Sequence, residues 1–438
     1  MTAPARTLRR VTDGWSVRAA LRTSHPVVLL LPVFAYLVLA TLVFPDRPDD
    51  ESGYIGLAHD LLDGRFSTGD ALLDPDRAYP DLWFGPGLPL LLLVPVALDL
   101  PLEMIRLIGP LFLCLALTVF LALMRLHVSR RAAIAATYLL ALYLPFSTVL
   151  TNVHSEPPAV LFVVVAMYAV GRHLAEGGRR WLVVGGGAFA ALALTRVDYG
   201  WVLTILLAAL LVWWACTRDP TPRRVASMCA LGLALCVPWL VYTTAETGRL
   251  AQWGTSGSLS LYWMSSPYPG DLGDWQQANA VLVDPDLAPH KPFFERLEGL
   301  SLARQNAELE RAALNHIQDN PAKFAENVVA NLSRMFFDVP YSYTEQRASA
   351  LYFALPNALL LSAVVFAAVV AVRVRGSLPP PTAPFLLFGA TSLALHAVLA
   401  AYPRMLMPIV PVMVWFVVVV AANHVRVATR DQDGARPA

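Results

Sequence analysis

The chain alternates between long apolar stretches and short polar loops along most of its length. A helix needs about 20 apolar residues to cross the hydrocarbon core of a bilayer. Stretches near that length recur throughout the sequence, and they cover residues 27–44, 104–124, 132–150, 157–171, 181–194, 199–216, 225–243, 349–372, 384–401 and 405–423. The pattern predicts an all-α polytopic membrane protein with about ten transmembrane helices.

One further apolar segment, residues 86–99, is short for a span and contains three prolines. The arginines decide whether it crosses, because cytoplasmic loops carry an excess of basic residues. If it does not cross and the N-terminus is cytoplasmic, the arginine clusters that follow residues 124, 171, 216, 372 and 425 all face the cytoplasm. If it crosses, these clusters lie on the outer side of the membrane, away from the N-terminal arginines. We therefore predict that this segment dips into the outer leaflet or lies along it.

This topology divides the chain into five parts. They are a cytoplasmic N-terminal segment (1–26), transmembrane helices 1–7 (27–243), an extracytoplasmic loop domain (244–347), transmembrane helices 8–10 (348–425) and a cytoplasmic tail (426–438). The first outer loop, residues 45–103, carries an acidic stretch followed by the juxtamembrane hairpin. The apolar stretch 27–44 has no convincing cleavage site at its end, so we expect it to remain as the first span.

The loop domain changes character along its length. Its first half is rich in glycine, serine and proline and carries Trp253, Trp263 and Trp275. Its second half has helical patterning over 293–318. A second helix is expected to run to about residue 337, with Asn320 as its N-cap and a proline at its first helical position.

Composition agrees with a membrane protein, since 56% of the residues are hydrophobic and only 15% are charged. The net charge of +1 lends no support to nucleic-acid binding. The four cysteines lack the spacing of metal ligands and read as small apolar core residues, at Cys114, Cys216, Cys229 and Cys236.

Three carboxylates, Asp49, Asp50 and Glu51, follow the first span directly. Behind them apolar residues recur at helical spacing up to Gly64, which predicts an amphipathic helix on the bilayer surface with acids at its N-terminal tip. The simplest interpretation is a capped surface helix, because Asp50 is a good N-cap and acids in a first turn offset the helix dipole.

The predicted topology places other polar groups at the same outer face. They are His154 and Glu156 after the third span, Arg196 and Asp198 after the fifth, and Arg404 before the tenth. Acids and arginines at one depth suggest a site that binds an anionic head group and activates a nucleophile.

Each of these groups also has a structural interpretation. The sequence from His154 to Pro158 could be an ordinary helix start, and Arg196 could simply pair with Asp198. Arg404 could have no role beyond extending its charged side chain to the membrane interface. Elsewhere, His396 is a lone histidine in a span and reads as a hydrogen-bonded core residue. The sequence contains no P-loop, dinucleotide fingerprint or nucleophile elbow.

Five short motifs in this order resemble the GT-C superfamily of integral-membrane glycosyltransferases. They are Asp50–Tyr54, Gly85–Leu91, Ser155–Pro157, Leu194–Arg196 and Tyr402–Pro408. Within that superfamily the chain is most similar to bacterial proteins related to protein mannosyltransferases and to the aminoarabinose transferases of lipid A.

The resemblance implies inverting transfer of a sugar from a polyprenyl-phosphate donor to a glycan, lipid or protein acceptor on the outer face of the cytoplasmic membrane. Asp50 would then be the general base that takes the acceptor hydroxyl proton, and Glu51 would orient the base or the acceptor. Arg404, Arg196 and Tyr402 would bind the leaving lipid phosphate.

By the same resemblance, further side chains are expected to contact the substrates, namely Asp49, Tyr54, His154, Glu156 and Asp198. Some members of the superfamily hold a divalent metal with acids from the first and second outer loops. Asp50 and Glu156 occupy similar places, but the second loop has no paired aspartates. A metal cofactor therefore stays open at this stage.

A transporter or flippase for lipid-linked saccharides is the alternative function, because it too would place arginines near a lipid phosphate. Such proteins have polar groups at the bilayer midplane between repeated halves. The spans of this chain are nearly free of midplane charges, which favours an enzyme. A polymerase of lipid-linked repeat units shares the topology and stays open.

Overall fold

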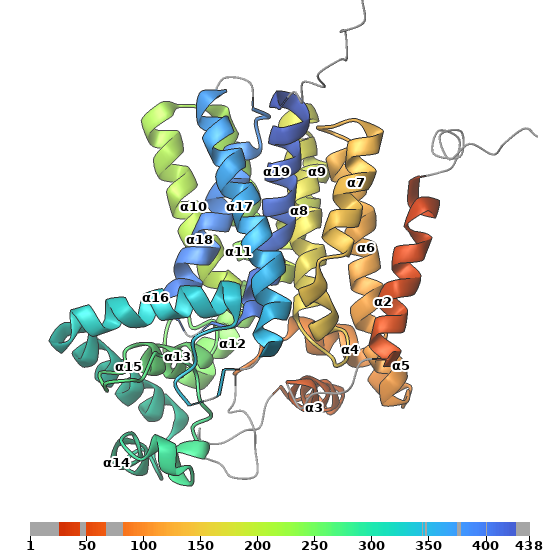
Figure 1. Cartoon of the computed structure of the whole chain (residues 1–438). Coiled ribbons are helices and arrows are strands. Elements are labelled where there is room, and N and C mark those ends of the chain that lie inside the picture. The colour runs from red at the N-terminus through yellow and green to blue at the C-terminus, as the bar shows by residue number, and fades with distance from the viewer. Residues whose placement is uncertain are drawn as a thin grey trace, which may run out of the picture.

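The computed structural model describes residues 26–43, 50–66, 82–343, 345–346, 348–374, 378–399 and 401–425. Within these ranges the chain forms helices and no strands. Long helices pack side by side into a bundle, and shorter helices gather at one end of it (Figure 1). Asp49, the N-terminal segment before residue 26 and the tail after residue 425 lie outside the described residues.

The bundle consists of helices that follow the predicted apolar stretches, with 3-10 turns at three of their starts or ends. Its α-helices are α2 (Leu31–Val43), α6 (Ile108–Met124), α7 (Arg130–Ala141), α8 (Glu156–Glu176), α9 (Arg179–Thr195), α10 (Asp198–Thr217), α11 (Pro220–Leu235), α17 (Leu351–Arg373), α18 (Thr382–Val398) and α19 (Val410–His424). The turns are η1 (Pro26–Leu30), η2 (Leu144–Val149) and η7 (Pro403–Ile409).

Most elements at this end of the bundle belong to the two large predicted outer loops, whereas those at 237–247 and 348–350 fall mainly in predicted spans. Those of the first loop are α3 (Glu51–Leu62), α4 (Gly87–Ala97) and α5 (Leu102–Arg106). The later ones are α12 (Val237–Thr247), α13 (Ser256–Met264), η3 (Ala280–Leu282), η4 (Pro285–Leu287), α14 (Lys291–Glu295), α15 (Leu302–Asp319), α16 (Pro321–Phe337) and η5 (Ala348–Ala350).

The chain is a multi-pass membrane protein, but the predicted count of ten spans is not confirmed. Among the described residues, five helices are long and apolar enough to cross, and α11 and α12 would add a sixth if this pair, bent by 48°, forms one span. Helices α2, α4 and α18 are apolar but shorter. At 11 residues, α4 reaches only about 16 Å, roughly half of a bilayer core. This length agrees with the prediction that residues 86–99 do not cross.

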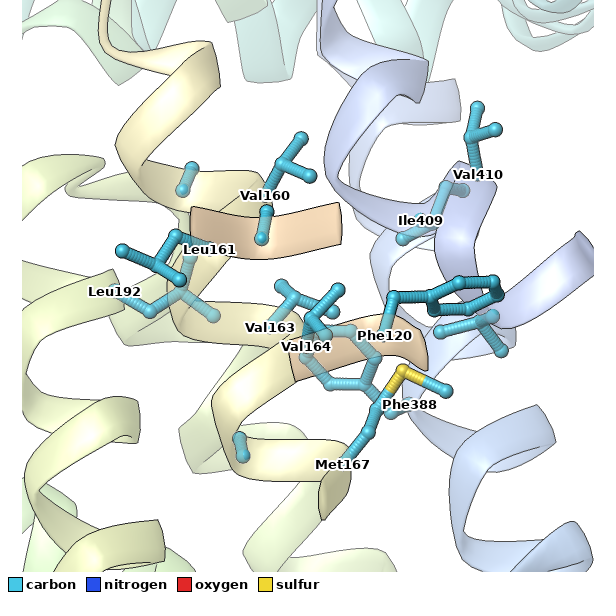
Figure 2. Packing of buried hydrophobic residues seen from close by; sticks show 14 of the residues in the cluster. Phe120, Val160, Leu161, Val163, Val164, Met167, Leu192, Phe388, Ile409 and Val410 are labelled. Atoms are coloured by element: carbon cyan, nitrogen blue, oxygen red, sulfur yellow. The ribbon is translucent and has the colours of Figure 1, made fainter. Parts of the chain in front are cut away.

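Helix α8 forms the centre of the bundle because apolar residues surround it on nearly every side. Figure 2 shows Val160, Val164 and Met167 of α8 packed among Phe120 of α6 and Phe388 of α18. The start of α8 carries Glu156 and lies at the same end as α3. Burial of α8 therefore holds a polar group in place beneath the short helices.

The loop domain has its own apolar core, separate from that of the bundle. Trp263 of α13 is fully buried in this core and stacks against Phe294 of α14. The predicted helix after Asn320 is present as α16, although the Asn320 side chain makes no capping hydrogen bond. Figure 1 shows that α2 begins and α19 ends at the end of the bundle opposite this domain. The cytoplasmic and extracytoplasmic assignment of the two ends stays a prediction.

Candidate active site

A cavity of about 1150 Å³ opens where the loop domain meets the end of the bundle. Its lining comes from α3, from the turns before α8 and α10, from the loop domain and from η7. Eight of the predicted site residues line it: Asp50, Tyr54, His154, Glu156, Arg196, Asp198, Tyr402 and Arg404. The structure thus brings together groups that the sequence spreads over more than 350 positions.

The Asp50 side chain does not cap the helix that it precedes. Asp50 occupies the N-cap position of α3, yet its carboxylate makes no capping hydrogen bond. Oδ2 instead accepts a hydrogen bond from Nη1 of Arg404 at 2.7 Å. Asp50 is only 7% exposed, whereas the Arg404 side chain is 25% exposed, so this ion pair is partly buried at the cavity wall. The interpretation of Asp50 as a simple surface cap is therefore wrong.

Arg404 also approaches a second carboxylate, because its Nε lies 3.8 Å from Oε1 of Glu156. Arg196 donates from Nη1 to the same Oε1 at 2.5 Å. His154 completes the cluster, with its Nδ1 at 3.5 Å from Arg404 Nη1 and 3.8 Å from Glu156 Oε2. Buried charges need partners of opposite sign, and this alternation of acids and arginines supplies them.

Arg196 pairs with Asp198, and His396 is hydrogen-bonded, as their structural interpretations predicted. Both residues nevertheless line the cavity. Arg196 does approach Asp198, at 3.5 Å from Nε to Oδ1. The other carboxylate oxygen of Asp198 lies 2.7 Å from Nε2 of His396. Nδ1 of His396 lies 2.7 Å from the carbonyl oxygen of Ser392, so both ring nitrogens face oxygen acceptors.

Glu51 does not line the cavity. Its carboxylate binds the Arg106 guanidinium through two hydrogen bonds of 2.9 and 2.8 Å. It also accepts a hydrogen bond from the backbone N–H of Val153 at 2.9 Å. These contacts join α3 to α5 and to the segment just before His154, so Glu51 orients the structure that carries Asp50.

Tyr54 and Tyr402 line the cavity but use their side chains largely for packing. Tyr54 lies against Phe84, with ring centroids 4.3 Å apart. Burial, together with the nearby Asp50 carboxylate, raises the pKa of Tyr54 above its usual range, which keeps the phenol neutral. Tyr402 donates its hydroxyl to the carbonyl oxygen of Trp275 at 2.9 Å. Tyr402 therefore connects η7 to the loop domain.

Asn331 of α16 positions the segment that carries Arg404. Its side-chain amide donates to the carbonyl oxygens of His396, Ala397 and Leu399 at 2.7–3.1 Å. Its carbonyl oxygen accepts from the N–H of Ala401 at 2.9 Å. Asn331 is fully buried, so these hydrogen bonds anchor the end of α18 just before η7 begins.

The acids of the cavity do not fit a divalent cation. Arginine nitrogens already approach a carboxylate oxygen of Asp50 and of Glu156, the two candidate ligands. Among the described residues, no three histidine, cysteine or acidic side chains converge as a metal site would require. In this arrangement Arg404 lies between the two acids, where a shared metal would lie.

Two of the sequence motifs prove to be packed directly against each other. The motif from Gly85 to Leu91 contacts the end of α9, where Arg196 follows. A Cβ atom on Gly87 would lie 2.5 Å from the backbone nitrogen of Thr195, and one on Gly85 would lie 2.1 Å from the carbonyl oxygen of Leu194. Both glycines are needed because the two backbones touch at this point.

We expect Gly87→Ala to lower the activity of this site by about 10- to 100-fold, because the added methyl group must push Thr195 and the adjacent Arg196 away. Gly56→Ala on α3 is the matched control, since a Cβ there meets nothing within 4 Å. Turnover and the thermal unfolding temperature would be measured for both variants. Equal activity of the two alanine variants at equal stability would contradict the positioning role of Gly87.

Sequence reasoning missed several residues of the cavity. His396 carried no signal, because a lone histidine in an apolar span has many uses. Trp83 lies in a stretch that the sequence interpretation passed over, and it packs against Trp275 with centroids 5.9 Å apart. Tyr341 stacks on Tyr402 at 6.2 Å. The tryptophans of the loop domain were the one sequence signal for aromatic residues in the site. Trp275 does line the cavity, whereas Trp263 is a core residue.

No protein-family model and no curated protein sequence matches the chain. Solved structures with a similar fold include the oligosaccharyltransferase of Archaeoglobus fulgidus tethered with an acceptor peptide, at 14% identity and a TM-score of 0.51. The match covers 89% of this chain and 49% of the other. A second structure, AglB from the same organism with an inhibitory peptide and a dolichol-phosphate, matches at 14% identity and a TM-score of 0.50. This second match covers 90% of the present chain and 50% of AglB.

ArnT from Cupriavidus metallidurans bound to undecaprenyl phosphate matches at 15% identity, with 90% of this chain and 77% of the other covered. Its TM-score is 0.40. The chain spans about half the length of the archaeal structures. At these identities the similarity shows the fold alone, which this chain shares with the archaeal oligosaccharyltransferases.

Proposed function

We propose that this protein is a membrane glycosyltransferase that moves a sugar from a polyprenyl-phosphate donor to an acceptor hydroxyl, with inversion at the anomeric carbon. The observation that carries the proposal is the contact between Asp50 and Arg404, 2.7 Å apart in one cavity. One group can accept a proton while the other can neutralise a phosphate. The similarity in fold to archaeal oligosaccharyltransferases, one of them in complex with a dolichol-phosphate, supports glycosyl transfer from a lipid phosphate.

In the proposed reaction the acceptor oxygen forms a bond to the anomeric carbon while the bond from that carbon to the phosphate oxygen breaks. The acceptor proton passes to the carboxylate of Asp50. A carboxylate with an ordinary pKa of about 4 is a weak base toward a hydroxyl, so the proton moves late, once the sugar is oxocarbenium-like. The leaving polyprenyl phosphate gains one negative charge as the bond breaks.

Arginines held in place before the reaction would stabilise that growing charge. Arg404 is the better candidate because its side chain is 25% exposed, whereas that of Arg196 is 9% exposed. Donors that are fixed in a dry site need no reorganisation when charge develops. The donor phosphate would therefore displace the Asp50 carboxylate from Arg404 and leave that carboxylate available to the acceptor.

An apolar part of the cavity would suit the lipid chain of the donor. Its lining includes Phe353 at the start of α17, Leu395 and Leu399 at the end of α18, and Met405 in η7. Helix α17 is largely exposed along its length, as expected for a helix that faces lipid. A polyprenyl chain could leave the cavity between these elements and enter the bilayer. The distribution of arginines supports a site on the outer face of the cytoplasmic membrane.

The test is to incubate the purified protein in proteoliposomes with a panel of polyprenyl-phosphate sugars and analyse the products by mass spectrometry. We expect one donor to be cleaved, with one equivalent of polyprenyl phosphate released per sugar transferred or hydrolysed. The same vesicles would report movement of intact, labelled donor between leaflets. Translocation without cleavage would contradict the proposal and support the flippase alternative.

A further inference from the structure

We propose that the acceptor is a neutral saccharide, bound by the wall that the loop domain contributes to the cavity. This inference rests on the proposed glycosyl transfer and names the second substrate of the same site. It follows from the difference between the two walls of the cavity, from the side chains of the loop-domain wall and from the aromatic rings that lie between them.

The two walls carry opposite kinds of charge. Arg196 and Arg404 both lie on the bundle side. Among the described residues that line the loop-domain side, there is no lysine or arginine, and the charged groups are the carboxylates of Glu310, Asp338 and Glu345. Glu310 is already paired with Arg249, so a phosphorylated or carboxylated acceptor would chiefly face the like charges of Asp338 and Glu345. An uncharged acceptor meets no such repulsion.

The remaining polar groups of this wall are hydroxyls and amides. Three serines of α13 line it, at positions 256, 258 and 260, together with Gln252 and Gln277. Hydroxyl and amide groups both donate and accept hydrogen bonds, as sugar hydroxyls do. Glu310 is held in place by two hydrogen bonds from Arg249, of 2.7 and 2.5 Å, and one from Ser258 of 3.1 Å. Three of the four lone-pair sites of this carboxylate are thus in use, and the fourth can accept one sugar hydroxyl.

Four aromatic rings connect the two walls. Trp83 packs against Trp275 at 5.9 Å, and Tyr341 stacks on Tyr402 with 25° between the ring planes. All four line the cavity. Indole and phenol rings offer an apolar face beside a polar edge, which suits the C–H face of a sugar ring whose hydroxyls need partners.

Space and secondary structure favour a saccharide over a peptide. Pockets for single small ligands measure about 300–1,000 Å³, and this cavity of about 1150 Å³ exceeds that range. It can therefore hold a donor head group and part of an acceptor together. Extended peptides often bind by adding a strand to a sheet edge. The described part of the loop domain offers helices and loops but no strand for such pairing.

The experiment uses the full-length protein in proteoliposomes with whichever lipid-linked sugar the donor panel identifies. Acceptors would be neutral oligosaccharides of mannose, glucose, galactose and arabinose, the same compounds carrying one phosphate, and a short peptide rich in serine and threonine. We expect transfer to at least one neutral oligosaccharide, and at least tenfold lower kcat/KM for its phosphorylated form. Equal or better use of the phosphorylated compounds or of the peptide would overturn the proposal.

Two variants test the wall itself. Trp275→Ala should raise the KM for the oligosaccharide by on the order of tenfold, because a stacking face is lost, and Trp275→Phe should restore most of it. Val283→Ala, at an exposed position outside the cavity, is the control. An unchanged KM in folded Trp275→Ala would overturn the assigned role.

Glu345→Lys is a complementary variant, because Glu345 is exposed and its replacement leaves the core of the protein intact. The new positive charge should improve the use of phosphorylated oligosaccharides severalfold relative to neutral ones. No change in that ratio would argue against charge selection by this wall. Failure of the proposed glycosyl transfer itself would look different. In that case no donor would be cleaved, whether or not an acceptor is present.

Discussion

Replacement of Asp50 by asparagine should lower sugar transfer by about 10²- to 10⁴-fold, the range that a positioned general base contributes. The amide has nearly the shape of the carboxylate but cannot accept the acceptor proton. It also removes the negative partner of Arg404, whose Nη1 lies 2.7 Å from Oδ2 of Asp50. Initial rates of transfer would be measured in proteoliposomes at equal amounts of folded protein.

Asp63→Asn is a matched control for this variant, because Asp63 ends the same helix and is exposed to solvent. It should transfer sugar at the rate of the unmodified protein. Donor binding by Asp50→Asn should be retained or strengthened, since Arg404 loses a competing anion. Full activity in Asp50→Asn would exclude Asp50 as the base and would direct attention to Glu156, the other acid of the cluster.

The second large effect is expected for Arg404→Ala, which should lower turnover by about 10²- to 10³-fold, as loss of one preorganised charge-stabilising group does. Its guanidinium lies between Asp50 and Glu156, so its removal also leaves two partly buried carboxylates with less compensation. Binding of polyprenyl phosphate should weaken in parallel. Both quantities would be measured, by turnover and by ligand-induced thermal stabilisation.

Arg404→Lys separates the two contributions of this side chain. Lysine keeps the charge but loses the planar fork that can contact two groups, so we expect partial recovery. Arg311→Ala, at an exposed position of α15, is the control for loss of an arginine in general. If Arg404→Ala bound the lipid phosphate as well as the unmodified protein does, Arg404 would be reduced to a structural partner of the two acids.

Local features of the chain were predictable because they depend on neighbouring residues. Apolar runs determine where helices form in a bilayer, and every predicted span corresponds to a helix or a helix pair. The start of α3 after Asp50 and the start of α16 after Asn320 follow from residues within one turn of each position. The start of α4 after Pro86 is marked in the same way, although Pro95 lies inside the helix.

The number of spans was less predictable, because helix length depends on where tertiary packing ends each helix. The predicted span 132–150 illustrates this. The chain leaves α7 at Ala141 and forms η2 from Leu144, where Ser147 and Tyr143 contact α17. Hydrophobicity alone cannot distinguish a straight helix from such a bent segment.

Runs of adjacent residues are enough to specify a bundle of apolar helices with acids and arginines at the helix ends. Which of these groups meet depends on the packing of the folded chain. It paired Asp50 with Arg404 across 354 positions, turned Glu51 toward Arg106 and brought His396 to Asp198. The physical reason is that such contacts depend on how whole helices pack around α8, and no local pattern records that packing.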